Sequence, residues 1–78
     1  MEAIRVPYSA AVEMRLIVGE RVFPLAQLGY GFAILRNAAE LPASQGRIEI
    51  WLDGSRSDVF SVAMPSGISA KRFLWFAE

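Results

Sequence analysis

The chain contains no cysteine and no histidine, and these two absences exclude several classes of function. Without cysteine there is no disulfide framework, no thiolate zinc site and no thiol nucleophile, and no redox compartment is indicated. Without histidine the chain lacks the commonest general base and the commonest metal ligand. Carboxylates, serines and a single lysine remain for catalysis. We therefore expect no enzyme, no cofactor and no metal site.

The sequence also lacks an excess of charge of either sign. Its eight basic and eight acidic residues cancel, and the only adjacent pair of like charges is Lys71-Arg72. A neutral chain has no long-range field to attract a nucleic-acid backbone or an anionic membrane. We therefore do not expect nucleic acid or a membrane among its partners.

Long apolar runs are missing as well. Near the N-terminus, Glu2, Arg5, Pro7 and Glu13 interrupt the stretch that a secretory signal would need. No segment approaches the length of apolar chain that spans a membrane. The expected location is the cytoplasm.

Apolar residues are nevertheless abundant, at 54% of the 78 residues against 21% charged. This composition lies outside the range that is typical of disordered proteins, although a domain so small buries only roughly 60% of its unfolded surface. We expect residues 12–78 to form one small domain. Residues 1–11 are expected to form an arm that orders only when something pins it.

A first hairpin is predicted from the alternation of residues 12–18, in which every second side chain is apolar. Gly19-Glu20 then supplies a two-residue turn of type II′ into residues 21–23. Pro24 has no N–H to donate, so it ends this strand or places it at a sheet edge.

A second hairpin is predicted from residues 47–52 and 59–64, joined by a polar turn over residues 53–58. Residues 32–35 and 72–76 add two apolar strands. Residues 37–46 are expected to form a loop with at most one helical turn, because Pro42 stops a helix there.

Five to six short strands separated by turn residues indicate an all-β fold, either a small antiparallel β-barrel or a sandwich. No repeat, low-complexity tract or second domain is visible. The residues that share faces under strand periodicity form the expected core: Met14, Leu16, Val18, Phe32, Ile34, Ile48, Ile50, Leu52, Phe60 and Val62.

Residues 28–35 read LGYGFAIL, in which two glycines bracket Tyr30. A dinucleotide-binding loop would read G-x-G-x-x-G and open a helix, and here only G-x-G is present before a strand. One interpretation is a bulge or bend that redirects the chain into the strand at Phe32. The other is a contact site in which the Tyr30 ring stands exposed. Trp51 has the same two interpretations, cross-strand packing or an interface anchor.

The remaining carboxylates are poorly placed for catalysis. Glu13 and Glu49 alternate with apolar residues and are expected to face solvent, and Asp53 and Asp58 are expected to lie in a turn. Two carboxylates alone make an incomplete metal shell.

The layout of residues 14–67 resembles the PilZ-type β-barrel domains. It has an early hairpin, a glycine-containing corner that leads into an apolar strand, a Leu-Pro followed by a glycine, and a strand pair that ends in Pro-x-Gly. Such domains bind cyclic di-GMP through an R-x-x-x-R arm and a D/N-x-S-x-x-G loop. Arg15 is followed four positions later by Gly19, and Arg21 by Leu25. The corner at residues 27–32 has Gln for Asp or Asn, Gly for Ser and Phe for Gly. The resemblance therefore implies a degenerate member that does not bind cyclic di-GMP.

The C-terminal strand is apolar on both faces, so its side chains cannot all enter one core. The outward pair either covers the open end of its own sheet or packs on another copy, because exposed edges and apolar patches seldom persist unprotected. We expect a homo-oligomer or a protein partner, with these candidate partner-binding residues: Tyr30, Trp51, Phe73, Leu74, Trp75 and Phe76.

The alternative is a nucleotide- or RNA-binding small barrel. In that interpretation, aromatic side chains stack on bases beside arginines. The residues concerned would be Tyr30, Phe32, Trp51, Arg36, Arg47 and Arg56.

Overall fold

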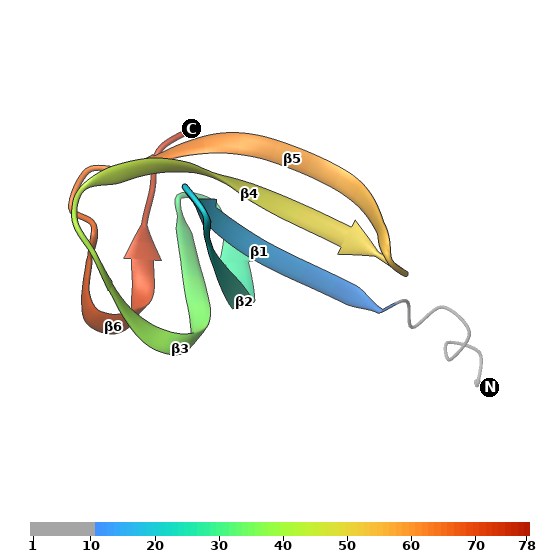
Figure 1. Ribbon diagram of the computed structural model, residues 1–78, viewed down its shortest axis with the longest axis horizontal. Coiled ribbons are helices and arrows are strands. Elements are labelled where there is room, and N and C mark those ends of the chain that lie inside the picture. Colours follow the sequence, from blue (N-terminus) through green and yellow to red (C-terminus); the bar gives the residue numbers. More distant parts are fainter. Residues whose placement is uncertain (1–10) are drawn as a thin grey trace.

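The alternating segments form six antiparallel strands in the computed structural model, which describes residues 11–78 (Figure 1). The strands are β1 Val12–Val18, β2 Arg21–Gly29, β3 Phe32–Leu41, β4 Ser44–Leu52, β5 Ser55–Met64 and β6 Ile68–Trp75. The described part of the chain contains no helix, so the predicted all-β class is confirmed. The predicted arm lies outside the described residues except for Ala11.

All six strands belong to one sheet with the order β5-β4-β1-β2-β3-β6. The sheet curls, and the segment that follows β6 reaches β5, the opposite edge strand (Figure 1). There Ala63 N donates to Ala77 O at 2.7 Å, and Ala77 N donates to Ala63 O at 2.9 Å. This single bridge joins the two edges at one point and does not close the sheet into a barrel.

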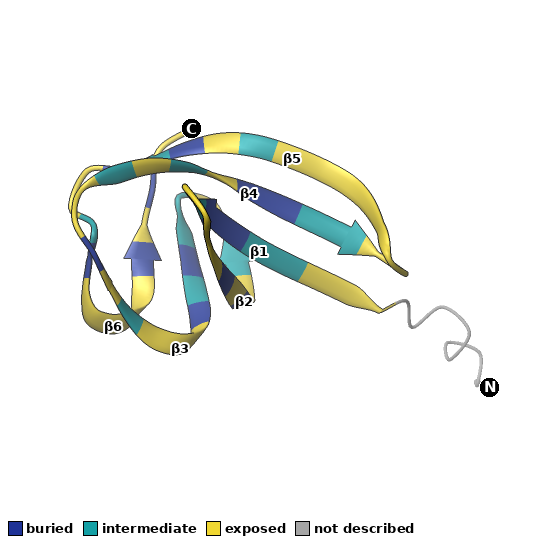
Figure 2. Ribbon diagram, viewed as in Figure 1, coloured by how far each residue is buried: buried dark blue, intermediate teal, exposed yellow. Residues whose placement is uncertain are grey.

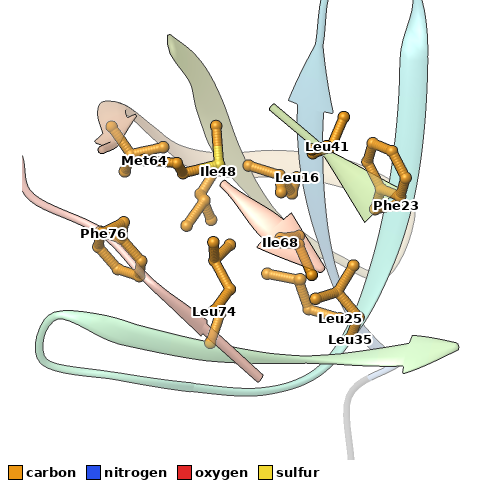
Figure 3. Packing of buried hydrophobic residues seen from close by; sticks show 12 residues of the cluster. Leu16, Phe23, Leu25, Leu35, Leu41, Ile48, Met64, Ile68, Leu74 and Phe76 are labelled. Carbon is orange, nitrogen blue, oxygen red and sulfur yellow. The ribbon is translucent and has the colours of Figure 1, made fainter. Parts of the chain in front are cut away.

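One of the two central strands of the sheet is β1, which pairs with β2 on one side and β4 on the other. Leu16 lies opposite both Phe23 and Ile48, so three apolar side chains project from one face in adjacent strands. The buried cluster adds residues from β3, β5 and β6, and its side chains point toward one another inside the curved sheet (Figure 3). Its members are Leu16, Phe23, Leu25, Ala33, Leu35, Leu41, Ile48, Val62, Met64, Ile68, Leu74 and Phe76.

The predicted core faces are confirmed in β1 and β5 and are wrong in β3. Leu16, Ile48 and Val62 are buried, and three further predicted core residues pack against the cluster while partly buried: Met14, Val18 and Phe60. In β3, however, Ala33 and Leu35 enter the core, whereas Phe32 and Ile34 lie on the other face. All four residues of this stretch are apolar, so the sequence pattern does not indicate which of them face the core.

The β4–β5 hairpin extends beyond the core. Buried positions gather toward the curved end of the sheet, and the far ends of β1 and β5 are exposed (Figure 2). Leu52 is accordingly 41% exposed opposite Val12, and Ile50 is only partly buried. The prediction that Ile50 and Leu52 belong to the core is therefore wrong.

Two predicted loops are strands instead. The turn between β4 and β5 consists of Asp53 and Gly54 alone, with φ angles of 51° and 84°, so Asp58 lies inside β5. Residues 37–41 extend β3, because Ala39, Glu40 and Leu41 pair with β6. Tertiary pairing overrides the weak strand propensity of this segment.

Pro24 neither ends β2 nor lies in an edge strand. It pairs with Arg15 of β1, while the β2–β3 ladder begins only at Leu25. An N–H at position 24 would have pointed toward β3. Because β3 is no longer paired with β2 at this position, proline is tolerated there.

Candidate functional site

The C-terminal strand divides its apolar side chains between the two faces of the sheet. Leu74 and Phe76 enter the core and are 1% and 7% exposed. Phe73 and Trp75 project from the outer face and are 39% and 64% exposed. Since successive residues of a strand alternate, this division is the one that the sequence predicted, and Phe73 and Trp75 are its outward pair.

Phe32 completes a cluster of three rings on this outer face, which we call the aromatic face (Phe32, Phe73 and Trp75). Phe32 stacks on Phe73 with ring centroids 5.4 Å apart and an interplanar angle of 4°. Trp75 meets Phe73 edge to face at 4.9 Å, and it meets Phe32 at 6.4 Å. Stacked and edge-to-face pairs of this kind hold the rings in place. The aromatic face is thus an ordered apolar surface.

Local sequence explains the position of the Phe32 ring. Gly29 lies opposite Phe32 in the β2–β3 hairpin, and a Cβ atom at Gly29 would overlap that ring. The ring therefore occupies space that only glycine leaves open. The LGYGFAIL segment is a hairpin corner that places an aromatic ring on the outer face.

The aromatic face borders an unpaired strand edge. Within residues 11–78, β6 pairs with β3 along one side and has no strand along the other. Phe76 N donates to Gly31 O toward β3, whereas Ala77 directs both of its backbone groups to β5. Because backbone groups alternate sides along a strand, those of Phe73 and Trp75 point to the open edge.

A hollow of about 170 Å³ lies beside this edge, where β6 curves past its left-handed residue Ala70. Phe73 and Trp75 form its aromatic wall, and Lys71 lines it on the same side of the strand. Its other lining residues are Ser66, Gly67, Ile68 and Ser69.

Tyr30 lies apart from the aromatic face. It occupies the tip of the β2–β3 turn and is fully exposed. It lines a hollow of about 260 Å³ with Leu28, Gly29, Phe60 and Glu78. The structure therefore leaves the Tyr30 ring open to solvent, in line with the contact interpretation, and it also shows the bend of the other interpretation.

Trp51 is not a free ring. Its Nε1 donates to Glu49 Oε1 at 3.0 Å, and the Arg15 guanidinium lies 4.7 Å from its ring centre. Arg15 in turn bonds Glu13 at 2.6 Å. Trp51 is therefore held by cross-strand packing on the outer face of β1 and β4, as the first of its two interpretations stated.

Glu49 is the centre of this second cluster, and the prediction that it faces solvent is wrong, because it is only 5% exposed. Arg47 Nε donates to Glu49 Oε2 at 3.0 Å, and Arg56 lies 3.6 Å from the same oxygen. The hydrogen bond from Arg47 and then that from Trp51 lower the pKa of Glu49 below its usual value, against the raising effect of desolvation. Neighbours on its own face bury this carboxylate and hold it ionised.

The residues of the nucleotide-binding alternative do not form one surface, and the three that meet, Trp51, Arg47 and Arg56, meet at Glu49. Arg47 and Arg56 face Glu49, Trp51 carries Arg15 on its ring, and Phe32 is stacked on Phe73. Arg36 lines a different hollow. No stacking platform with adjacent unpaired arginines is formed by these residues.

The Asp53 and Asp58 carboxylates of the β4–β5 hairpin accept hydrogen bonds from backbone N–H groups. Asp53 Oδ1 accepts from Ala11 N at 3.0 Å, and Asp58 Oδ1 accepts from Val59 N at 2.9 Å. Across residues 11–78, no three acidic side chains gather into a possible metal site. The same residues include no helix that is long and apolar enough to cross a membrane.

Of the candidate partner-binding residues, only Phe73 and Trp75 lie together on an exposed surface. Sequence reasoning placed Phe32 in the core and made it an exposed ring only in the nucleotide-binding alternative, so it was not among the candidate partner-binding residues. Comparisons with models of protein families, with curated proteins and with solved structures find no match. The aromatic face and the strand edge beside it are therefore the features of the molecule that bear on its function.

Proposed function

We propose that the protein is a non-enzymatic interaction module that self-associates through the aromatic face. The observation that carries this proposal is the 64% exposure of Trp75 beside Phe73 at an unpaired strand edge. Tryptophan is strongly enriched among the side chains that anchor protein interfaces. An ordered apolar surface of this kind is stabilised when another molecule removes it from water.

A second copy of the chain is the partner that fits both features. An open edge pairs its backbone groups with another strand, and two identical edges related by a two-fold axis do so reciprocally. The small core supports the same idea, because a domain of 78 residues gains proportionally more from shared apolar burial than a large one.

The double substitution Phe73→Ser and Trp75→Ser tests the proposal. Light scattering across a concentration series should give a mass that rises to that of an oligomer for the wild type and stays monomeric for the variant. The variant should keep its far-ultraviolet circular dichroism, because both side chains lie outside the core cluster. Val12→Ser with Val22→Ser is the matched control, since these two residues are 49% and 54% exposed on β1 and β2.

A wild-type mass that stays monomeric to high micromolar concentration would contradict self-association. Equal association of the wild type and the double serine variant would instead remove the aromatic face as the interface. Loss of association in the Val12 and Val22 control would show that general surface apolarity is responsible.

A further inference from the structure

The open edge of β6 has a defined usable length. Ala70 has a left-handed φ of 54°, which interrupts the strand on one side. On the other side Phe76 and Ala77 already bond Gly31 and Ala63. The segment available to another strand is therefore residues 71–75, and its middle residue is Phe73.

Alternation decides which residues of this segment can exchange hydrogen bonds. The backbone groups of Phe73 and Trp75 point to the open edge, and by the same alternation those of Lys71 do too. Lys71, Phe73 and Trp75 also line the same hollow, so their side chains share one face.

We propose that two copies pair β6 with β6 in antiparallel fashion about a two-fold axis at Phe73, an inference that rests on the proposed function. In this register Phe73 lies opposite Phe73 of the second copy, and Lys71 lies opposite its Trp75. All of the available segment is used, with no residue left over at either end.

Charge and aromatic chemistry favour this register over its neighbours. An ammonium group opposite an indole ring forms a cation–π pair, and the two-fold axis makes this pair twice. An axis at Arg72 would place two arginines directly opposite each other, which is destabilising. An axis at Leu74 would place Lys71 opposite Ala77, whose backbone is already hydrogen-bonded to Ala63 of β5.

Because the chain has no cysteine, a single introduced thiol reports one contact. Directly opposed residues that exchange hydrogen bonds have Cα atoms about 5.5 Å apart, within the range that a disulfide spans. Phe73→Cys should therefore form a disulfide-linked dimer under mild oxidation. Lys71→Cys alone should not, because the two thiols would lie roughly 14 Å apart along the strands at about 3.4 Å per residue. An equimolar mixture of Lys71→Cys and Trp75→Cys should form the mixed disulfide.

Lys71→Ala keeps every ring and tests the cation–π pair separately. Loss of two such pairs should raise the dissociation constant of the dimer at least about 5-fold and up to several hundred-fold, while Lys71→Arg should stay close to the wild type. Val59→Cys, on the opposite edge strand, is the control for non-specific oxidation.

The outcomes separate the two proposals. A wild type that never associates overturns both. A wild type that associates, with cysteine variants that still associate by light scattering but are not oxidised to a dimer either as Phe73→Cys or as the mixed pair, overturns the register alone. Cross-linking of Val59→Cys at the same yield as Phe73→Cys also overturns the register.

Discussion

The carboxylate of Glu49 holds together side chains from two strands on the outer face of the sheet. It accepts hydrogen bonds from Arg47 and Trp51 on its own strand, and it lies near Arg56 of β5. A buried carboxylate that keeps its charge in the folded state stabilises that state only while it is ionised. Stability should therefore depend on pH through this residue.

Glu49→Gln tests this dependence. The folded pKa of Glu49 is lowered, so its contribution is fully present above the unfolded value of about 4.3 and is lost as the pH falls through the folded value. Urea denaturation should show the variant less stable than the wild type at neutral pH, with a gap that narrows as the pH is lowered below about 4.3. Glu20→Gln, in the exposed β1–β2 turn, controls for the change in net charge. A gap that is constant with pH would show that packing, not charge, is responsible.

Ile48 and Ile50 offer a matched pair for the extent of the core. Both lie in β4, but Ile48 is fully buried and Ile50 is only partly buried beyond the cluster. Ile48→Ala should lower the free energy of unfolding by about 2–5 kcal/mol, and Ile50→Ala should lower it by less. Equal losses in denaturant melts would mean that the core extends further along the β4–β5 hairpin.

At the scale of elements, sequence pattern predicted the core face of β1, which alternates, and chose the wrong face for residues 32–35, which do not alternate. In β1, Glu13 and Arg15 alternate with apolar residues, and the core face of this strand was predicted correctly. Residues 32–35 are apolar at every position, so periodicity could not choose a face, and the choice fell to packing. Ala33 fits beneath its neighbours in the core, while the larger Phe32 ring uses the space over Gly29.

The extension of β3 over residues 37–41 illustrates a second limit. Asn37, two alanines and Glu40 have low strand propensity, and Pro42 indicated a break. Their pairing partners in β6 lie about 30 positions away in sequence. Local sequence carries no information on such a partner. The aromatic face was predictable only in part. Alternation within β6 separated Phe73 and Trp75 from Leu74 and Phe76, but the position of Phe32 beside them depends on the pairing of β3 with β6.

The turn between β5 and β6 gives a prediction on close backbone approach. Gly67 and Gly19 have nearly equal φ angles, 60° and 61°, but a Cβ atom at Gly67 would overlap the carbonyl oxygen of Leu41, and one at Gly19 would meet open space. Gly19→Ala should cost about 1–2 kcal/mol for its backbone conformation alone. Gly67→Ala should cost at least about 1 kcal/mol more, because backbone overlap forces the two segments apart. Equal shifts in thermal melts would contradict the close approach.

For the molecule as a whole, we expect no binding of cyclic di-GMP. Arg15 and Arg21 do not begin an R-x-x-x-R arm, and the corner at residues 27–32 lacks the Asp or Asn and the Ser of the second motif. Arg15 is moreover engaged by Glu13 and Trp51. Isothermal calorimetry should detect no heat of binding. Micromolar affinity would show that other residues have rebuilt the site, and Arg15, Arg21 and Arg36 would be the first to replace.

The outer face of β6 is proposed to be covered by a second copy of the chain, and Trp75 on that face reports on this directly. Trp51 and Trp75 are the two tryptophans of the chain, so Trp51→Phe leaves Trp75 as the sole emitter. Trp75→Phe keeps an aromatic ring at position 75 and is the matched control, with Trp51 as the emitter on β4, away from the strand of the proposed interface.

Iodide quenching of tryptophan emission should be measured on both variants from low to high micromolar protein concentration. We expect Trp75 emission to be readily quenched at low concentration, and to become protected and blue-shifted as concentration rises. Trp51 emission should stay unchanged. Trp75 emission that is equally quenched at every concentration would contradict the proposal that this face is the interface between copies of the chain.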